Sequence, residues 1–265
     1  MDASAPLPPA SSRPGHRRGL PGRARALLAM LGMLAGFAPL ALPAPAEAAP
    51  KRIIIVRHGE KLNPLKLCAT GEERARALAA QYLSPTSPMS LLKGERPAAI
   101  LAITLHTLET ARPIAAAWGM RVPTNALMLT PIRNNRYFNS LINVQNRKVA
   151  RDLLENPRWH GTTVVLVWEH FHIASAALEA EFAGEEVTLR QLLHLDQVKG
   201  VPGGVPATWP NPTFNYFWIL DYDSPTAQVP ARFTTVRQNF APPFANLPNN
   251  AWGTPEQLPP GADCT

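Results

Sequence analysis

Apolar runs alternate with helical patterns along this chain. Short runs of β-branched and other apolar residues predict buried strands at 52–56, 98–104, 162–168 and 216–223. Small and apolar residues at helical spacing predict helices at 70–83, 105–118, 147–156 and 173–182. This alternation predicts an α/β fold: a three-layer sandwich with a mostly parallel central sheet and helices on both faces.

Local signals refine several of these elements. Thr70 is the expected N-cap of the helix at 70–83. Pro113 lies inside the next helical pattern, so that helix is expected to kink or to start late. Residues 121–147 are predicted to be rich in loops. The segment 241–265 has many prolines and no periodicity, which predicts an irregular tail on the surface.

The first 48 residues have the layout of a secretory signal peptide. Five arginines precede an apolar run at 26–42, and Ala46-Glu47-Ala48 fits a small-x-small cleavage site. An uncleaved membrane anchor is the alternative, but glycines and a proline interrupt the run. We therefore expect an exported protein, periplasmic or secreted, without stable membrane insertion after cleavage. Its folded domain is expected at 49–240.

Charge and cysteine content narrow the classes of partner. The formal charge of +7 falls to +4 without residues 1–48, and no Lys/Arg block of a nucleic-acid binder is present. A modest positive field suits small anionic substrates. Cys68 and Cys264 form no CxxC pair, which excludes a metal-thiolate site. In an exported protein they either form one disulfide, joining the tail to the body, or remain two free thiols.

Histidines follow three of the four predicted strands. The first strand runs into Arg57-His58-Gly59, the third into Glu169-His170, and His106 comes two residues after the second. Ligands bind in such sheets at the carboxyl ends of the strands. A single histidine in this position is more often structural than functional, but three together predict a site at this rim.

Several sequence blocks share a family pattern. They are "VRHGEK" at 56–61, "LCATGEERARALA" at 67–79, "ITLHTLETARPIAAAWG" at 103–119, "VVLVWEHFHI" at 164–173 and "GVPGGVPATWPNPTFNYFWILDYD" at 200–223. In order and spacing these blocks resemble the histidine phosphatase superfamily, the phosphoglycerate mutase-like proteins. The similarity covers roughly residues 51–223.

The resemblance implies a hydrolase that acts on a phosphomonoester or related phosphoryl group and needs no metal or cofactor. His58 would be the nucleophile, and Arg57 and His170 would bind the phosphate. The chemistry of these residue types agrees. A neutral imidazole can attack phosphorus and form a phosphohistidine, which divides the displacement into two steps. Arginine binds two phosphoryl oxygens at once and stays charged.

The second block departs from the family pattern in its charge. His106 stands where a second phosphate-binding arginine is usual. A histidine is charged only part of the time near neutral pH, but His106 can still bind phosphate by donating one hydrogen bond. Arg133 and Arg136, in the following loop, are the candidates for restoring the charge; the alternative is that they belong to a solvated basic loop.

The general acid is absent from its usual places. Phe171 follows the second histidine, where one branch of the family has the acid, and 121–147 contains no acid at all. If the strand continues through Glu169, its side chain points away from His170. Glu60 is therefore the preferred candidate.

Two other functions compete with the phosphatase. A non-catalytic, phosphate-binding descendant would explain the lost arginine and the missing acid. A metal site would need His58, His106, His170 and His172 to converge, and Arg57 beside them would repel the cation. The phosphatase remains the leading hypothesis, with a small anionic phosphorylated substrate as its partner and no nucleic acid.

Overall fold

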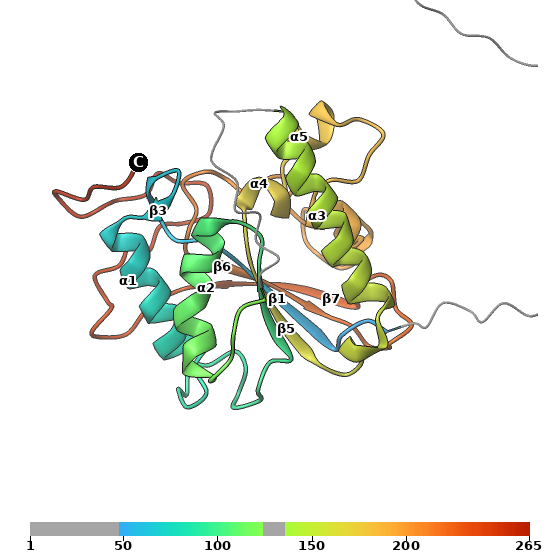
Figure 1. The fold of residues 1–265 in the computed structure, drawn as a ribbon, viewed down its shortest axis with the longest axis horizontal. Coiled ribbons are helices and arrows are strands. Elements are labelled where there is room, and N and C mark those ends of the chain that lie inside the picture. The colour runs from blue at the N-terminus through green and yellow to red at the C-terminus, as the bar shows by residue number, and fades with distance from the viewer. Residues whose placement is uncertain (1–47, 124–135) are drawn as a thin grey trace, which may run out of the picture. The chain divides into compact units, whose positions relative to one another are not determined.

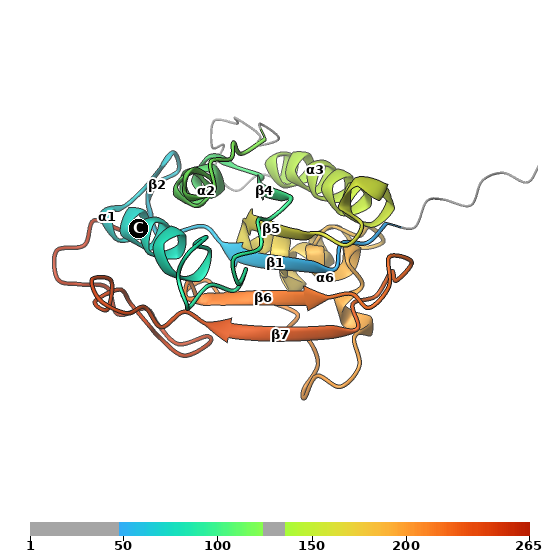
Figure 2. The same cartoon turned by 90° about the horizontal axis from the view of Figure 1, so that it is seen from below.

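The computed structural model describes residues 48–123 and 136–265. Its main feature is a five-stranded sheet in the order β4-β5-β1-β6-β7, shown in Figures 1 and 2. The strands are β1 (Arg52–Arg57), β4 (Ala99–Ala102), β5 (Thr163–Trp168), β6 (Tyr216–Asp221) and β7 (Arg232–Arg237). β1, β4 and β5 are parallel, β6 runs against β1, and β7 runs against β6. Four of the five strands therefore point the same way.

The helices and the smaller elements connect these strands. The α-helices are α1 (Ala69–Ala77), α2 (Leu105–Ala117), α3 (Arg136–Glu155), α4 (His170–Ile173), α5 (Ala176–Glu181) and α6 (Leu189–Leu192). α1 continues as a π-helical turn at Leu78–Tyr82, and 3-10 turns lie at Pro157–Trp159 and Leu195–Gln197. A small hairpin, β2 (Lys61–Asn63) and β3 (Lys66–Leu67), follows β1.

Strand alternation builds one core on each face of the sheet. Ile53 and Ile55 of β1 face a cluster with residues of α3 and α6, whereas Ile54 and Val56 face α1 and α2. All four side chains are fully buried. Figure 1 shows α2 and α3 on opposite sides of the sheet. The predicted three-layer α/β fold with a mostly parallel sheet is confirmed.

Some expected boundaries differ from the structure. α1 begins at Ala69 after Cys68, so Thr70 is not its N-cap. α2 runs through Pro113 without ending there. The predicted loop at 121–147 gives way to α3 from Arg136 onward, and β7 was not expected. Apart from Ala48, the segment 1–48 predicted as a signal peptide lies outside the described residues.

Two glycines let the end of β1 pack directly against α1. A Cβ atom added to Gly59 would lie 2.6 Å from the carbonyl oxygen of Gly71, and one added to Gly71 would lie 2.2 Å from that of Glu60. Both contacts are to backbone, which cannot swing aside. Gly59 is thus required for the contact between β1 and α1.

The C-terminal tail is joined to the body by a disulfide between Cys68 and Cys264, which settles the alternative that the sequence left open. The backbone N–H of Thr265 also donates to the carbonyl of Lys61. Within the described residues, no helix is long and apolar enough to cross a membrane.

Replacing both cysteines with serine is expected to lower the free energy of unfolding by about 2–5 kcal/mol, because the crosslink restricts the unfolded chain. The tail at 241–265 should then be cut faster in limited proteolysis. Reduction of the wild-type disulfide should reproduce both effects and leave the double variant unchanged. Equal proteolysis of oxidised and reduced wild type would contradict this role.

Candidate functional site

The carboxyl ends of three parallel strands meet at one rim of the sheet. Arg57 at the end of β1 pairs in register with Trp168 at the end of β5, and the backbone N–H of His58 donates to the Trp168 carbonyl. β4 ends beside β5, and the chain then enters α2 at Leu105. Residues that follow these strand ends are therefore neighbours in space.

His58 is fully buried and has a defined tautomer. Its Nδ1 lies 2.6 Å from the carbonyl oxygen of Gly59, an atom that only accepts, so Nδ1 carries the proton. In the neutral ring Nε2 then holds a lone pair, and it makes no hydrogen bond within the described residues. Burial, with a smaller contribution from the charge of Lys61, lowers the pKa of His58 to about 4. The imidazole is neutral at neutral pH.

Two further imidazoles face His58. The ring centroids of His106 and His170 lie 5.8 Å and 6.0 Å from that of His58. His106 Nε2 donates to the Asn63 carbonyl at 2.8 Å, and His170 Nε2 donates to Asn211 Oδ1 at 2.7 Å. His170 Nδ1 is buried without a partner among the described residues. Burial also lowers the pKa of both histidines. Each therefore keeps its lone pair on Nδ1.

Arg57 is buried beside this cluster and holds a loop in place. Its Nη1 donates to the backbone carbonyls of Pro210, Asn211 and Thr213, and its Cζ lies 3.7 Å from the centre of the Phe214 ring. Burial lowers the pKa of Arg57 to about 9, so the group stays charged at neutral pH. Its Nε–H is a buried donor without a described partner.

Glu169 places a carboxylate in the middle of the cluster. One oxygen accepts from Thr104 Oγ1 at 2.6 Å; the other lies 3.2 Å from His58 Nε2 and 3.4 Å from Lys61 Nζ. Burial opposes ionisation, but the charge of Lys61 and the hydrogen bond from Thr104 outweigh it. The pKa of Glu169 is consequently held well below its usual value. The site thus contains an internal anion.

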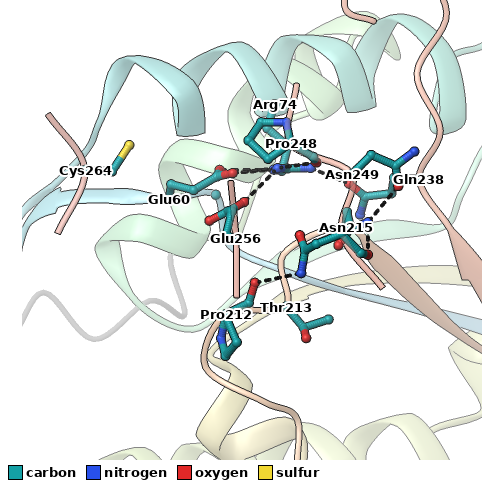
Figure 3. Close-up of polar contacts among 12 residues, drawn as sticks. Glu60, Arg74, Pro212, Thr213, Asn215, Gln238, Pro248, Asn249, Glu256 and Cys264 are labelled. Atoms are coloured by element: carbon teal, nitrogen blue, oxygen red, sulfur yellow. Dashed lines mark hydrogen bonds and ion pairs between the residues drawn. The ribbon is translucent and has the colours of Figure 1, made fainter. Parts of the chain in front are cut away.

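Glu60, the candidate general acid, points elsewhere. Its carboxylate accepts from Nε and Nη2 of Arg74, at 3.0 Å and 2.5 Å, and both side chains are buried (Figure 3). Arg74 also bonds Glu256 of the tail at 3.2 Å. The structure therefore corrects the sequence interpretation: Glu60 is committed to a structural ion pair, and Glu169 is the acid that contacts His58.

Glu256 shares this buried space with a second carboxylate. Burial and the neighbouring Glu60 raise the pKa of Glu256 to about 9, so it is protonated in the folded protein at neutral pH. In the unfolded chain the same group loses its proton near its ordinary pKa of 4.5. Its contribution to stability is therefore full below about pH 4.5 and is lost as the pH rises toward 9.

Glu256→Gln mimics the neutral carboxyl group and should remove this pH dependence. We expect the variant to gain about 1 kcal/mol or more over wild type near pH 8, and the difference to vanish near pH 5. Urea unfolding at several pH values measures it. Glu72→Gln, on the exposed face of α1, is the control and should not alter the slope. Parallel pH profiles of Glu256→Gln and wild type would contradict the assignment.

Arg136 and Arg133 were the two arginines expected to restore the positive charge of the site, and the structure describes only the first of them. Arg136 donates to the backbone carbonyl of Glu181, and its Cζ lies 4.5 Å from the centre of the Phe182 ring. These contacts direct Arg136 toward α5 and not toward His58. Arg133 lies outside the described residues.

Sequence reasoning missed three groups that the structure brings to the cluster: Glu169, Thr104 and Lys61. Glu169 was expected to point away because the strand was extended through it. β5 ends at Trp168, however, and Glu169 is the N-cap of α4, so both Glu169 and His170 turn inward. The "WEH" sequence after an apolar run was the available signal.

A cavity of about 370 Å³ opens beside the cluster. Its polar wall includes Lys61, Thr104, His106 and Glu169. Its apolar wall is formed by Leu105, Phe138, Ile142 and Phe171. The cavity has room for the organic part of a small substrate next to the polar cluster.

Comparison with known proteins gives matches among solved structures alone. No family model matches the chain, and no curated protein is similar to it. The mycobacterial glucosyl-3-phosphoglycerate phosphatase is 18% identical over 72% of this chain and 99% of its own, with a TM-score of 0.38. The structure of the same phosphatase in complex with VO3 has a TM-score of 0.39 and covers 72% of this chain and 100% of its own. The Agrobacterium tumefaciens protein named phosphohistidine phosphatase SixA is 18% identical over 71% and 96%, with a TM-score of 0.30.

These solved structures are named as phosphatases. Matches of this strength carry no information about activity, which we infer from the site residues.

Proposed function

We propose that this protein is a hydrolase that transfers a phosphoryl group from a small anionic substrate to His58 Nε2 and then to water. The observation that carries the proposal is the fixed tautomer of His58. Its Nδ1–H is held by the Gly59 carbonyl, so the lone pair of Nε2 is directed into the cluster. A buried, neutral and oriented imidazole is what nucleophilic attack on phosphorus requires.

The surrounding groups can balance the charge of a phosphoryl group. Arg57 offers its unpaired Nε–H, and Lys61 contributes a second positive charge at the rim. His106 and His170 can each take up a proton when a dianion binds beside them, because the negative charge favours the imidazolium form. Fixed donors of this kind stabilise the charge that develops during transfer.

Glu169 supplies the acid and base in this proposal. A phosphate dianion beside its carboxylate favours the protonated form, because two adjacent like charges are costly. In the first step the P–O bond of the ester breaks, the P–Nε2 bond forms, and Glu169 gives its proton to the leaving oxygen. In the second step water attacks phosphorus, Glu169 accepts a proton from that water, and the P–Nε2 bond breaks.

A non-catalytic phosphate-binding protein is the second candidate. The position of Glu169 favours it, since the carboxylate occupies space within 3.2 Å of the nucleophilic nitrogen. In that case an anion would bind only after Glu169 moves or is protonated, and no turnover would follow.

Trapping of a phosphohistidine separates the two candidates. The protein would be mixed with an aryl phosphate, quenched in alkali, which preserves phosphohistidine, and digested for mass spectrometry. The proposal expects a phosphate group on the peptide containing His58. Anion binding without label and without turnover would support the second candidate, and neither binding nor turnover across a panel of phosphates would overturn both.

Export is a separate proposal that rests on the leader at residues 1–48. The disulfide between Cys68 and Cys264 supports an oxidising compartment, where such bonds persist. Fractionation of cells that express the full chain tests it, with a form lacking residues 1–48 as the control.

A further inference from the structure

We propose that His58, His170 and Glu169 form a binding site for one divalent transition-metal ion, such as Zn²⁺, that competes with phosphate. One ligand atom from each of the three residues lies within 4.8 Å of the other two. The inference concerns a cation, and it does not depend on the proposed phosphatase activity. Two imidazoles and a carboxylate form a common ligand set for zinc.

The outer nitrogen of each imidazole is already engaged, as in metal-binding histidines. His58 Nδ1–H donates to the Gly59 carbonyl, and His170 Nε2–H donates to Asn211 Oδ1. This leaves His58 Nε2 and His170 Nδ1 as buried lone pairs without a partner among the described residues. Outer-shell acceptors fix the tautomer of a ligand in this way and increase its basicity.

The spacing of the inner atoms also fits an ion. His58 Nε2 and Glu169 Oε2 lie 3.2 Å apart and make no hydrogen bond with each other. Two atoms bound to Zn²⁺ at its usual bond lengths in a tetrahedral arrangement are about 3.3 Å apart. His106 Nδ1 lies 3.9 Å from the other carboxylate oxygen, Glu169 Oε1, and is outside the group of three ligands.

The nearby positive charges weaken this site without blocking it. Arg57 is held toward Phe214 and the carbonyls of the loop at 210–213. The Lys61 side chain is 29% exposed, so its ammonium group can move into solvent when Glu169 binds an ion. Lys61 should therefore affect cations and anions in opposite directions.

Metal binding can be measured on the full chain, stripped with chelator and kept oxidised. We expect one Zn²⁺ or Co²⁺ per chain by calorimetry, and a Co²⁺ absorption spectrum typical of nitrogen ligands. His170→Ala and Glu169→Gln should each weaken binding by at least about tenfold, since even outer-shell changes cost 10–100-fold. His172→Asn, which removes a buried imidazole outside the site, is the control and should bind as wild type does.

Lys61→Met gives the sharper test. We expect it to bind Zn²⁺ several-fold more tightly and vanadate more weakly than wild type, and Zn²⁺ should be displaced by vanadate in both. The inference is overturned if wild type binds no ion at micromolar concentration, if the Co²⁺ spectrum lacks nitrogen ligands, or if Lys61→Met weakens zinc binding. Failure of vanadate binding with zinc binding intact would overturn the proposed phosphatase and the competition between the two ligands, while the metal site itself would stand.

Discussion

Turnover of an aryl phosphate is expected to fall by about 10⁴-fold or more when His58 is replaced by alanine. The loss follows from removing the nucleophile, because the remaining charges can bind the substrate but cannot form the covalent intermediate. A factor of 10⁴ corresponds to about 5.5 kcal/mol of transition-state stabilisation. The affinity for vanadate should change far less than the turnover number, since Arg57 and Lys61 remain.

His172→Asn is the matched control for this experiment. His172 is also a buried imidazole, with Nε2 bonded to Asn143 Oδ1, but it is outside the group formed by His58, Glu169 and His170. We expect its turnover to stay within about tenfold of wild type. Comparable turnover by His58→Ala and wild type, measured with and without chelator, would remove His58 from the mechanism.

Arg74→Met is expected to lower the free energy of unfolding by about 3–5 kcal/mol, because it leaves the carboxylate of Glu60 buried without its partner. Arg74 is completely buried, and it also donates to Gln238 and to the Pro248 carbonyl (Figure 3). For a domain of this size the melting temperature should fall by roughly 10 °C. Urea unfolding and thermal melting at neutral pH both measure the change.

The same helix provides the control. Arg76 forms an exposed ion pair with Glu72, and Arg76→Met should cost no more than about 0.5 kcal/mol. Adding Glu60→Gln to Arg74→Met removes the unpaired charge, so the double variant should recover part of the loss. Equal stabilities of Arg74→Met and Arg76→Met would show that the buried pair contributes little.

The strand core and the meeting of the histidines could be predicted from the sequence. The apolar runs of β1, β4, β5 and β6 are unambiguous, and parallel strands bring their carboxyl ends together. His58, His106 and His170 are neighbours for that reason. Their chemical roles do not follow from position and remain proposals.

The first half of α3 was missed because polar residues occupy core positions in it. Asn143 and Asn146 are buried, so the side of the helix that faces the core is not uniformly apolar and its helical period is not visible in the sequence. Asn146 donates to the carbonyls of His172 and Val187 and accepts from Trp168. A buried amide satisfied by distant backbone leaves no local signal in the sequence.

The direction in which the Glu169 side chain points depends on the exact residue at which β5 ends. Extension of β5 by one residue would have turned its side chain to the other face. The packing of neighbouring elements decides the exact last residue of a strand. The local sequence pattern does not predict it. Glu60 shows the reverse error. It is near His58 in sequence, but its carboxylate binds Arg74 in a separate buried cluster.

β7 has a further consequence for how the protein behaves in concentrated solution. It is the outer strand of the sheet beyond β6, and much of its surface is exposed to solvent. Its sequence places Arg232 and Arg237 at the two ends, with Thr234 and Thr235 between them. Charged and short polar side chains on an outer strand discourage a second molecule from extending the sheet, and so protect the protein against aggregation.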